Sequence, residues 1–508
     1  MNCVIGIDIG TQGTKSVLID IDRGVLGSAY RGYQPSTPRP LYAEQWPDVW
    51  LQSVYEVIRE VIETTGADAE SVKSIAVSSL YGGSGIPVDS QIKPVHPCLI
   101  WMDRRATSEV AWVREHIDLD RLYEITGNYV DSYYGFTKIL WIKNRQPDVW
   151  KKIKYLLPPN AYVIYRLTGE TAVDYSSAGN IGGIFDIKQK EWSGEMLSQL
   201  DIPREFFPER LVDSSEIVGK IHAGAAKKTG LKTGTPVIAG GVDAPVATLA
   251  AGAFAPGTHV AMVGTSMCWG FVTEDTNLSK GLVSMPYVLN GRRYVYSFGG
   301  AITAGATANW FREQLGGLER EAARLTGISE YELLDRAAGQ VSAGSDGIVM
   351  LPYFMGERNP IWDPHAKGTI VGLNLTHTRA HLYRAFLEGV AYSLRHNMEE
   401  VVSKLPLKDE IILVGGAAKS RLWTKIFSDV TGYRIKIIKE DVEAPLGDAL
   451  LAALGAGLID DPEHMLRWFH FQYADDPDAE AKEIYDRRFA AYKEIYHGLK
   501  EVMRDLST

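Results

Sequence analysis

The sequence has little that would suggest a secreted or nucleic-acid-binding protein. It contains three cysteines in 508 residues, Cys3, Cys98 and Cys268, which are odd in number and far apart. This count argues against a disulfide framework and against a zinc site, and it fits a reducing compartment. Lys and Arg number 53 against 63 for Asp and Glu, a net charge of -10. Such a balance gives no electrostatic reason to bind nucleic acid or an anionic membrane.

Long apolar runs are also missing. The most apolar long stretch, 244–263, is rich in small residues and is interrupted by Pro245, Pro256 and His259. It therefore predicts buried core rather than a membrane span. Met1 leads directly into an apolar, strand-like run, without the basic, apolar and small-residue order of a signal peptide. We expect a cytoplasmic protein with no membrane partner.

Two common nucleotide-binding motifs are absent. The sequence contains neither the G-x-x-x-x-G-K-[ST] of a P-loop nor the G-x-G-x-x-G fingerprint of dinucleotide-binding proteins. None of the eleven histidines lies at metal-ligand spacing. An anionic ligand such as ATP would therefore be held by backbone amides, a cation and a few placed charges.

What is present is an α/β pattern long enough for two or three domains. The expected strands are 4–9, 15–20, 74–78, 236–243, 259–263 and 410–414, and the clearest expected helices are 48–64 and 480–506. A strand followed by a Gly-Thr turn occurs near residue 10 and again near residue 264. This echo suggests two related domains, 1–245 and 246–508, with a ligand between them. Residues 480–508 predict a closing amphipathic helix, and its packing back on the first domain is an open alternative.

The first Gly-Thr turn reads Asp8-x-Gly10-Thr11-x-Gly13-Thr14-Lys15. Glycines allow a tight turn whose N–H groups point at phosphate oxygens, and the threonine hydroxyls can add hydrogen bonds. Asp8 precedes the turn, where it could hold Mg²⁺ through water. The alternative is a plain hairpin loop with a surface aspartate. The second turn, Gly264-Thr265-Ser266, is a weak signal alone, but two such turns could surround a triphosphate tail.

Asp243 ends the segment Gly240-Gly241-Val242-Asp243. A carboxylate at a strand end beside glycines is placed as a general base, and phosphoryl transfer to a hydroxyl needs a group that takes its proton. The alternative is an N-cap for the helix that begins near Ala244.

Two further segments are candidates for ligand contact. In Trp101-Met102-Asp103-Arg104-Arg105 an aromatic face could pack on a sugar while the charged groups bond its hydroxyls. A core tryptophan with a surface ion-pair cluster is the alternative. In Val414-Gly415-Gly416-Ala417 a Gly-Gly turn before a helix would let adenine or ribose approach closely, or simply connect strand and helix.

Taken in order, these motifs resemble those of the FGGY carbohydrate kinases over essentially the whole chain. The matching segments are 6–15, 100–105, 137–142, 167–169, 174–178, 368–373 and 381–388, and two of them are near-complete family signatures. Gly135 stands where Pro, Ser or Thr is usual, and Phe386 where the family has a smaller residue.

The resemblance implies two ribonuclease H-like, actin-like ATPase domains with an interdomain catalytic cleft that holds ATP and Mg²⁺. Asp243 would be the base, and Asp8 would hold the metal. The nucleotide side would comprise Gly10, Thr11, Gly13, Thr14, Lys15, Gly264, Thr265, Ser266, Gly305, Gly415, Gly416 and Ala417. The substrate side would comprise Tyr81, Gly82, Trp101, Asp103, Arg104, Tyr133 and Asp243.

The expected substrate is a small-molecule sugar, a pentulose with xylulose first. The segments 351–360 and 363–368 are similar to those of xylulokinases and gluconate kinases. The segment 79–84 departs from the pattern, because xylulokinases usually place Met-His-Gly there, with the His meeting the sugar, and glycerol kinases an Arg-Glu pair. A gluconate, polyol or other ketose kinase is the alternative, followed by an actin-like ATPase without sugar kinase activity and by a regulatory relative that has lost catalysis. A homodimer is an open option.

Overall fold

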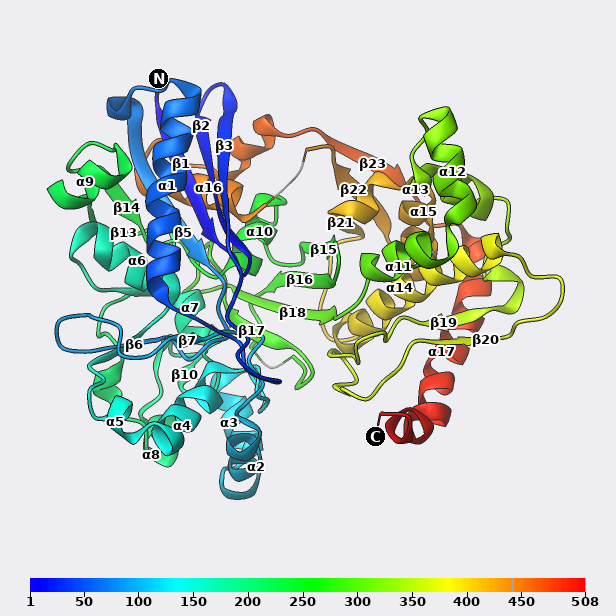
Figure 1. The fold of residues 1–508 in the computed structure, drawn as a ribbon, viewed down its shortest axis with the longest axis horizontal. Helices are drawn as coiled ribbons and strands as arrows, with labels where there is room; N and C mark the ends of the chain where they lie inside the picture. The colour runs from blue at the N-terminus through cyan, green and yellow to red at the C-terminus, as the bar shows by residue number, and fades with distance from the viewer. Residues whose placement is uncertain (277, 441–442, 508) are drawn as a thin grey trace. The chain divides into compact units, whose positions relative to one another are not determined.

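The computed structural model describes residues 1–276, 278–440 and 443–507. The chain forms two compact units, shown in Figure 1. Unit 1 comprises Met1–Pro256, Val272–Ser297 and Val442–Trp468, and unit 2 comprises Gly257–Phe271, Phe298–Asp441 and Phe469–Thr508. The units are thus discontinuous, whereas the division expected from the sequence, at residue 245, makes each domain one stretch. Two later segments join unit 1, one of which carries a helix that packs on its central strands.

Unit 1 is built on a six-stranded sheet of order β13-β14-β5-β1-β2-β3. Its strands are β1 (Cys3–Ile9), β2 (Gly13–Asp20), β3 (Gly24–Gly32), β4 (Glu44–Gln45), β5 (Val72–Ser79), β6 (Ile86–Val88), β7 (Cys98–Leu99), β8 (Tyr155–Leu157), β9 (Val173–Asp174), β10 (Phe185–Asp186), β11 (Glu191–Trp192), β12 (Leu211–Val212), β13 (Ile217–Lys220), β14 (Pro236–Ile238) and β17 (Val283–Pro286). Its helices are α1 (Pro47–Thr65), α2 (Thr107–His116), α3 (Leu119–Thr126), α4 (Gly135–Arg145), α5 (Pro147–Trp150), α6 (Pro159–Thr168), α7 (Tyr175–Asn180), α8 (Gly194–Gln199), α9 (Ala223–Thr229), α10 (Asp243–Ala250) and α16 (Ala444–Gly455).

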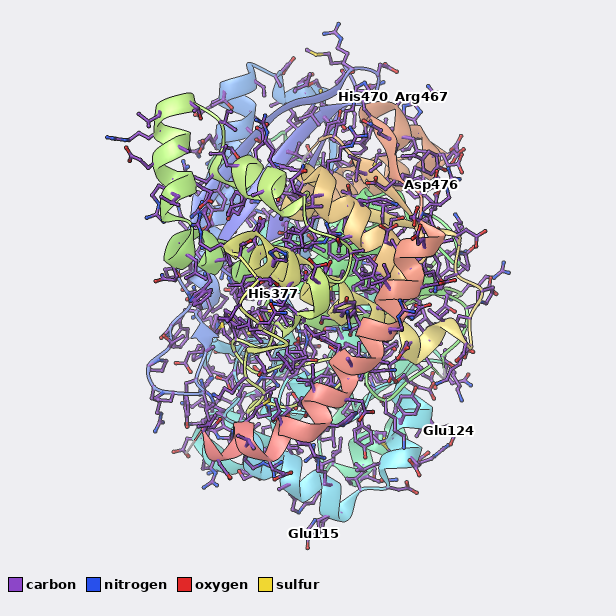
Figure 2. The ribbon with its side chains drawn as sticks, turned by 90° about the vertical axis from the view of Figure 1, so that its right-hand side faces the viewer. Glu115, Glu124, His377, Arg467, His470 and Asp476 are labelled. Atoms are coloured by element: carbon purple, nitrogen blue, oxygen red, sulfur yellow. The ribbon has the colours of Figure 1, made fainter. Side chains whose placement is uncertain are left out.

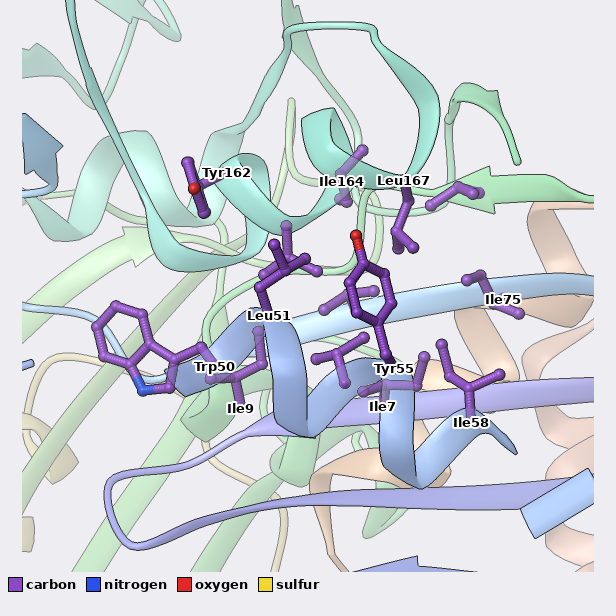
Figure 3. Close-up of a cluster of buried hydrophobic side chains, with 14 of the residues drawn as sticks. Ile7, Ile9, Trp50, Leu51, Tyr55, Ile58, Ile75, Tyr162, Ile164 and Leu167 are labelled. Carbon is purple, nitrogen blue, oxygen red and sulfur yellow. The ribbon is translucent and has the colours of Figure 1, made fainter. Parts of the chain in front are cut away.

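The central strand β1 uses its two faces differently, because side chains alternate across a strand. Ile5, Ile7 and Ile9 point into a core that α1 and α6 complete, part of which is drawn in Figure 3. On the other face α16 packs closely, and a Cβ at Gly6 would lie 1.8 Å from the Pro445 carbonyl oxygen. Only glycine permits that approach. Asp8 shares this second face, so the fold brings α16 to the edge of the candidate site.

Unit 2 contains a second sheet, in which strands run in the order β18-β16-β15-β21-β22-β23. Its strands are β15 (His259–Val263), β16 (Met267–Thr273), β18 (Val295–Ala301), β19 (Val349–Leu351), β20 (Thr369–Val371), β21 (Glu410–Val414), β22 (Arg434–Ile438) and β23 (Phe471–Asp475), of which β16 and β18 begin or end in unit 1. Its helices are α11 (Gly305–Leu315), α12 (Gly317–Thr326), α13 (Glu330–Ala338), α14 (Arg379–Val402), α15 (Arg421–Thr431) and α17 (Ala479–Asp505).

The closing helix predicted from the sequence forms as α17, the long red helix in Figure 2. It packs on α14, α15 and β19 of unit 2, and its buried side chains are Tyr485, Phe489, Tyr492, Tyr496 and Met503. The apolar segment 244–263 divides between α10 and β15. In the part of the chain that the structure describes, no helix is both long and apolar enough to cross a bilayer.

Candidate active site

The first Gly-Thr turn joins β1 to β2 as the sequence predicts, and neighbouring groups brace it. The Gly10 N–H donates to the Gly13 carbonyl at 2.9 Å. The Tyr33 hydroxyl donates to the Gly10 carbonyl at 2.8 Å and lies 3.2 Å from Thr14 Oγ1. Lys15, expected on the nucleotide side, forms an ion pair with Glu443, with both side chains nearly half exposed. The turn is therefore preformed, although its lysine already has a carboxylate partner.

Asp8 lies one residue from the end of β1, directly across from Ser78 on β5. The Ser78 hydroxyl lies 3.0 Å from Asp8 Oδ1. Surrounding protein displaces most of the hydration of this carboxyl group, and this raises its pKa to about 6, against the opposing pull of the Ser78 hydrogen bond and Lys15. No described residue forms a hydrogen bond with Asp8 Oδ2, so this oxygen is available to a ligand.

Asp243 is the first residue of α10, and its cap is Val242. The N-cap alternative is thus wrong by one position, although Asp243 Oδ1 does accept the Ala244 N–H at 2.7 Å. Burial, and then the charge of Asp8, raises the pKa of Asp243 to about 7. A carboxyl group whose pKa is near 7, and which has only a local backbone partner, has the properties of a general base.

The backbone that carries Asp243 is fixed by groups the sequence analysis did not select. The Val242 N–H donates to Ser176 Oγ at 3.0 Å, and Ser176 in turn donates to the buried Asp174 at 2.5 Å. Gly240 has φ +62°, and a Cβ there would lie 2.0 Å from the Val77 carbonyl oxygen. The sequence signal was the segment Asp174-Tyr175-Ser176, which was noted as a family match without a role.

The tryptophan segment combines a link to the turn with an internal ion pair. Trp101 Nε1 donates to Thr11 Oγ1 at 2.9 Å, which joins the predicted sugar side to the predicted phosphate side. Asp103 is fully buried, and it accepts the Ala43 N–H at 2.7 Å and Arg105 Nε at 2.8 Å. Arg104 forms an ion pair with Asp131, with both side chains about one-third exposed. Asp103 therefore has internal partners for its charge, and a direct sugar contact by this residue stays a prediction.

Tyr81, Gly82 and Tyr133 lie together as predicted for the substrate side. Gly82 has φ +79°, and a Cβ there would lie 2.9 Å from Tyr133 Cζ, so the tyrosine ring occupies the space that a side chain at residue 82 would need. The Tyr81 hydroxyl is buried without a hydrogen-bond partner among the described residues. A polar atom left unbonded in this way is costly unless a ligand or water pairs with it.

Lys138 is the substrate-side residue that the sequence analysis did not select. It is fully buried, and its Nζ donates to the carbonyls of Gly82 at 2.6 Å and Tyr133 at 2.7 Å. Desolvation lowers its pKa to about 7. A lysine within the apolar run 136–142 was the available signal, since lysine is rarely buried without a task.

Two of the departures from the family pattern, Gly135 and the segment 79–84, pack against each other. A Cβ at Gly135 would lie 1.9 Å from the Gly83 carbonyl oxygen. Gly135 stands where the family usually has Pro, Ser or Thr, and Gly83 belongs to the segment 79–84 that lacks the usual His. The unusual glycine in α4 is therefore what allows the unusual segment to lie where it does.

Unit 2 contains a cavity of about 1430 Å³. Of the residues predicted for the nucleotide side, Gly264, Thr265, Gly305, Gly416 and Ala417 line it. Ser266 and Gly415 do not, although both adjoin lining residues. The N–H groups of Ala304 and Gly305 donate to the carbonyls of Thr265 and Gly264 at 3.0 and 2.8 Å, so the start of α11 holds the second turn in place.

Much of the remaining cavity wall comes from helical residues outside the selected motifs. Trp310 is 40% exposed and its ring stacks on Phe386 at 5.9 Å between centroids. Asp335 accepts the Ser420 hydroxyl at 2.6 Å. A cavity with an exposed aromatic face, small residues and a few polar groups suits a nucleoside. These residues are scattered over α11, α13 and α15, so no local pattern marks them.

The unit 1 residues fit a cation that is bound mainly through water. No group of three or more His, Cys, Asp or Glu that could cage a metal occurs within 1–276, 278–440 and 443–507. Mg²⁺ does not require such a cage, since it usually keeps several waters and takes one or two carboxylates. Asp8 has one carboxylate oxygen without a bond to a described residue. The neighbouring Asp243 is also acidic and does not neutralise the charge of Asp8. A cation there would relieve the mutual repulsion of these two carboxylates.

A cavity that suits a nucleoside, in unit 2, and a pair of interacting carboxyl groups, in unit 1, are typical features of a phosphotransferase. Comparison with known proteins identifies the family. The model of the N-terminal domain of the FGGY family of carbohydrate kinases matches residues 3–250, and the model of its C-terminal domain matches residues 259–456. The chain belongs to this family. The predicted ATP-dependent carbohydrate kinase is thereby confirmed, and family membership disfavours an ATPase without sugar kinase activity.

Individual relatives agree with this assignment. The chain is 29% identical to "Xylulose kinase" of Bacillus subtilis (strain 168) over 506 residues, covering 99% of this chain and 98% of that one. It is 28% identical to "Gluconokinase" of the same organism over 465 residues, covering 90% and 88%. The crystal structure of xylulose kinase from Rhodospirillum rubrum matches with a TM-score of 0.88 at 28% identity, covering 99% of both chains. The predicted pair of ribonuclease H-like, actin-like domains is confirmed by such matches.

Proposed function

We propose that this protein transfers the γ-phosphoryl group of ATP to a hydroxyl group of a pentulose, with xylulose as the first candidate. The observation that carries the proposal is Asp243, a carboxyl group with a pKa near 7 beside the partly bonded Asp8. Full-length similarity to proteins named xylulose kinase supports the choice of sugar.

In this proposal Asp243 accepts the proton of the sugar hydroxyl as the new phosphorus–oxygen bond forms. A hydroxyl group is a poor nucleophile while it keeps its proton, so a base with a pKa near the working pH is effective. The carboxylate is held still by its bond to the Ala244 N–H and by the Ser176 contact to the preceding residue. Such fixed placement supplies much of the catalysis in phosphoryl transfer.

Asp8 would hold Mg²⁺ through its free carboxylate oxygen, and Mg²⁺ when bound supplies positive charge that neutralises phosphate oxygens. The N–H groups of the first turn would contact the phosphate tail, since Gly10 and Gly13 leave the backbone accessible. The cavity of unit 2 would hold adenosine, with Gly264 and Thr265 at its phosphate end.

The sugar would lie against Trp101 and Tyr133, with the buried Tyr81 hydroxyl available for a hydrogen bond. Because Gly82 replaces an imidazole, this site relies on backbone and tyrosine groups for hydroxyl recognition. A site built to bond hydroxyls rejects analogues that lack them. Gluconate is the second candidate substrate, since a gluconokinase is also similar over most of the chain.

A coupled ADP-release assay over pentuloses, hexuloses, polyols and aldonates tests the substrate. We expect the highest kcat/KM with xylulose, a clear preference over glycerol, and loss of turnover in the Asp243→Asn variant with every substrate. Gluconate outperforming all ketoses would overturn the pentulose assignment and leave the kinase intact. Absence of ADP release with any sugar would overturn the proposed function itself.

Two further proposals concern the state of the protein in the cell. We propose the cytoplasm as its location, because the chain has only three cysteines and two of them, Cys3 and Cys98, are buried free thiols. We also propose a homodimer, which light scattering of the purified protein would test directly.

A further inference from the structure

The most unusual polar group of unit 1 outside the predicted site is Asp448, in the middle of α16. Its side chain is fully buried, and one carboxyl oxygen, Oδ1, has no hydrogen-bond partner among the residues the structure describes. Leaving a buried acceptor unbonded destabilises the folded state. Such a group in an otherwise apolar helix is poor for stability, and this suggests a role in function.

The other oxygen of Asp448 connects it to the candidate active site. Ser78 Oγ lies 2.5 Å from Asp448 Oδ2 and 3.0 Å from Asp8 Oδ1, so one hydroxyl group bridges two carboxyl groups. The close packing of α16 on β1 at Gly6 makes this possible. All three residues belong to the same compact unit.

The number of available protons limits which group can donate in this bridge. A serine hydroxyl has one proton, so it can donate to only one of the two carboxyl groups. The second contact is a hydrogen bond only if the other carboxyl group carries a proton of its own. Asp448 is the more deeply buried of the two, and burying a neutral carboxyl group costs less than burying a charged one. With Asp448 as the protonated group, Asp448 donates to Ser78, and Ser78 donates to Asp8.

We propose that Asp448 is a positioning residue that acts on Asp8 through the Ser78 hydroxyl. The chain of bonds directs the Ser78 proton onto Asp8 Oδ1, which fixes the plane of that carboxylate and leaves Oδ2 for the cation. Burial and the charge of Asp8 both raise the pKa of Asp448 well above its ordinary value, in agreement with the neutral form. The inference rests on the proposed role of Asp8.

Three variants test the chain: Ser78→Ala, Asp448→Ala and Asp448→Asn. Asparagine is neutral and keeps an N–H donor toward Ser78, whereas alanine removes the donor. Binding of Mg·ADP and of ADP in EDTA is measured by calorimetry for each folded variant. We expect Ser78→Ala and Asp448→Ala to weaken Mg·ADP binding by roughly 10–100-fold, the usual cost of losing a group that orients a metal ligand. ADP binding in EDTA and the KM for sugar should not change, and Asp448→Asn should bind Mg·ADP nearly as well as wild type.

The outcomes that overturn the inference are distinct. If Asp448→Asn weakens Mg·ADP binding as much as Asp448→Ala does, the residue is needed as a charged carboxylate. If binding falls equally with and without metal, its role is only structural, and if neither alanine variant changes binding it has no role. Should Asp448→Ala fail to fold, Ser78→Ala decides alone by the same criteria. An Asp8→Ala control separates this test from the proposed function. If Asp8→Ala keeps full Mg·ADP affinity, the metal role of Asp8 is wrong. If Asp8→Ala loses Mg·ADP affinity while Ser78→Ala keeps it, only the hydrogen-bond chain through Asp448 is refuted.

Discussion

The predicted site residues of the two units have opposite surroundings. In unit 1 the predicted residues are largely buried and joined by hydrogen bonds, from Trp101 to Thr11 and from Ser78 to Asp8. In unit 2 the predicted turn residues Gly264, Thr265 and Gly416 are exposed and line a cavity of about 1430 Å³. Substitutions in unit 1 therefore test folding and chemistry together, whereas Gly264 of unit 2, where a Cβ meets no atom within 4 Å, can test ligand approach alone.

Asp243 should show the largest effect, because it is the proposed base and its carboxyl group has only a local backbone partner. Asp243→Asn keeps the shape and removes the base, so we expect turnover to fall by roughly 10²–10⁴-fold. Single-turnover kinetics with the best sugar, beside calorimetric binding of ATP, would measure this. Near wild-type turnover would show that another group takes the proton.

Asp103 is the contrasting unit 1 carboxylate, since its charge is paired with Arg105 inside the protein. Removing one partner of a buried ion pair costs about 3–5 kcal/mol, so Asp103→Ala should lower the free energy of unfolding by about that amount in urea denaturation. Arg104→Ala is the matched control, and its partly exposed ion pair should be worth about 1 kcal/mol or less. Unchanged stability with a selective loss of sugar affinity would instead support the direct sugar contact expected from the sequence.

The pH dependence of kcat/KM for the sugar should follow Asp243. Its pKa is raised from 3.8 to about 7, so the base is protonated below that pH, and kcat/KM should fall about tenfold per pH unit toward the acid side. Stability should move the other way. Between pH 4 and 7 the folded protein keeps a proton that the unfolded chain releases, so stability falls as pH rises through this window.

Asp243→Asn removes this titrating group, so its melting temperature relative to wild type should be higher at pH 8 than at pH 4. Parallel pH profiles of kcat/KM and of the melting temperature for both proteins provide the measurement. A kcat/KM that stays flat between pH 6 and pH 8 contradicts the assignment of the pKa to the base.

Gly264→Ala should show the smallest and most selective effect. A Cβ at this position meets no atom within 4 Å, so the protein can accommodate it, but a phosphate tail against the turn cannot. We expect the KM for ATP to rise several-fold while the KM for sugar stays unchanged. Gly305→Ala is the contrast, because its Cβ would lie 2.4 Å from the Gly264 carbonyl oxygen and must distort the turn. An equal rise of both KM values in Gly264→Ala would contradict the predicted contact.

Much of the fold could be predicted because its signals are local. Alternating apolar strands, the Gly-Thr hairpin at residue 10 and the Gly-Gly turn at 415–416 each specify a backbone shape within a few residues. The helix predicted at 48–64 forms as α1, and the strand predicted at 74–78 forms as β5. Asp8 and Asp243 were both found from their place at the end of a strand, and the structure places them near enough for the charge of Asp8 to raise the pKa of Asp243.

Other parts of the site could not be predicted, since they depend on residues far apart in the sequence. Lys138 reaches the carbonyl of Gly82 across 56 positions, and Ser78 meets Asp448 across 370. The cavity wall of unit 2 combines residues of α11, α13 and α15, which share no motif, with the two glycine turns. The pairing of Asp103 with Arg105 could not be predicted either, because an arginine two residues away could equally have pointed to solvent.

The sequence by itself determined the family, the order of strands and helices, and the identity of the two candidate acidic residues, because each depends on short segments with strong backbone preferences. The tertiary structure decided which charged side chains form ion pairs or hydrogen bonds inside the protein and which can still bind a ligand. It paired Asp103 with Arg105, set Gly135 against Gly83 and brought α16 back onto β1. These choices rest on close packing, where a single missing Cβ decides how near two segments can approach.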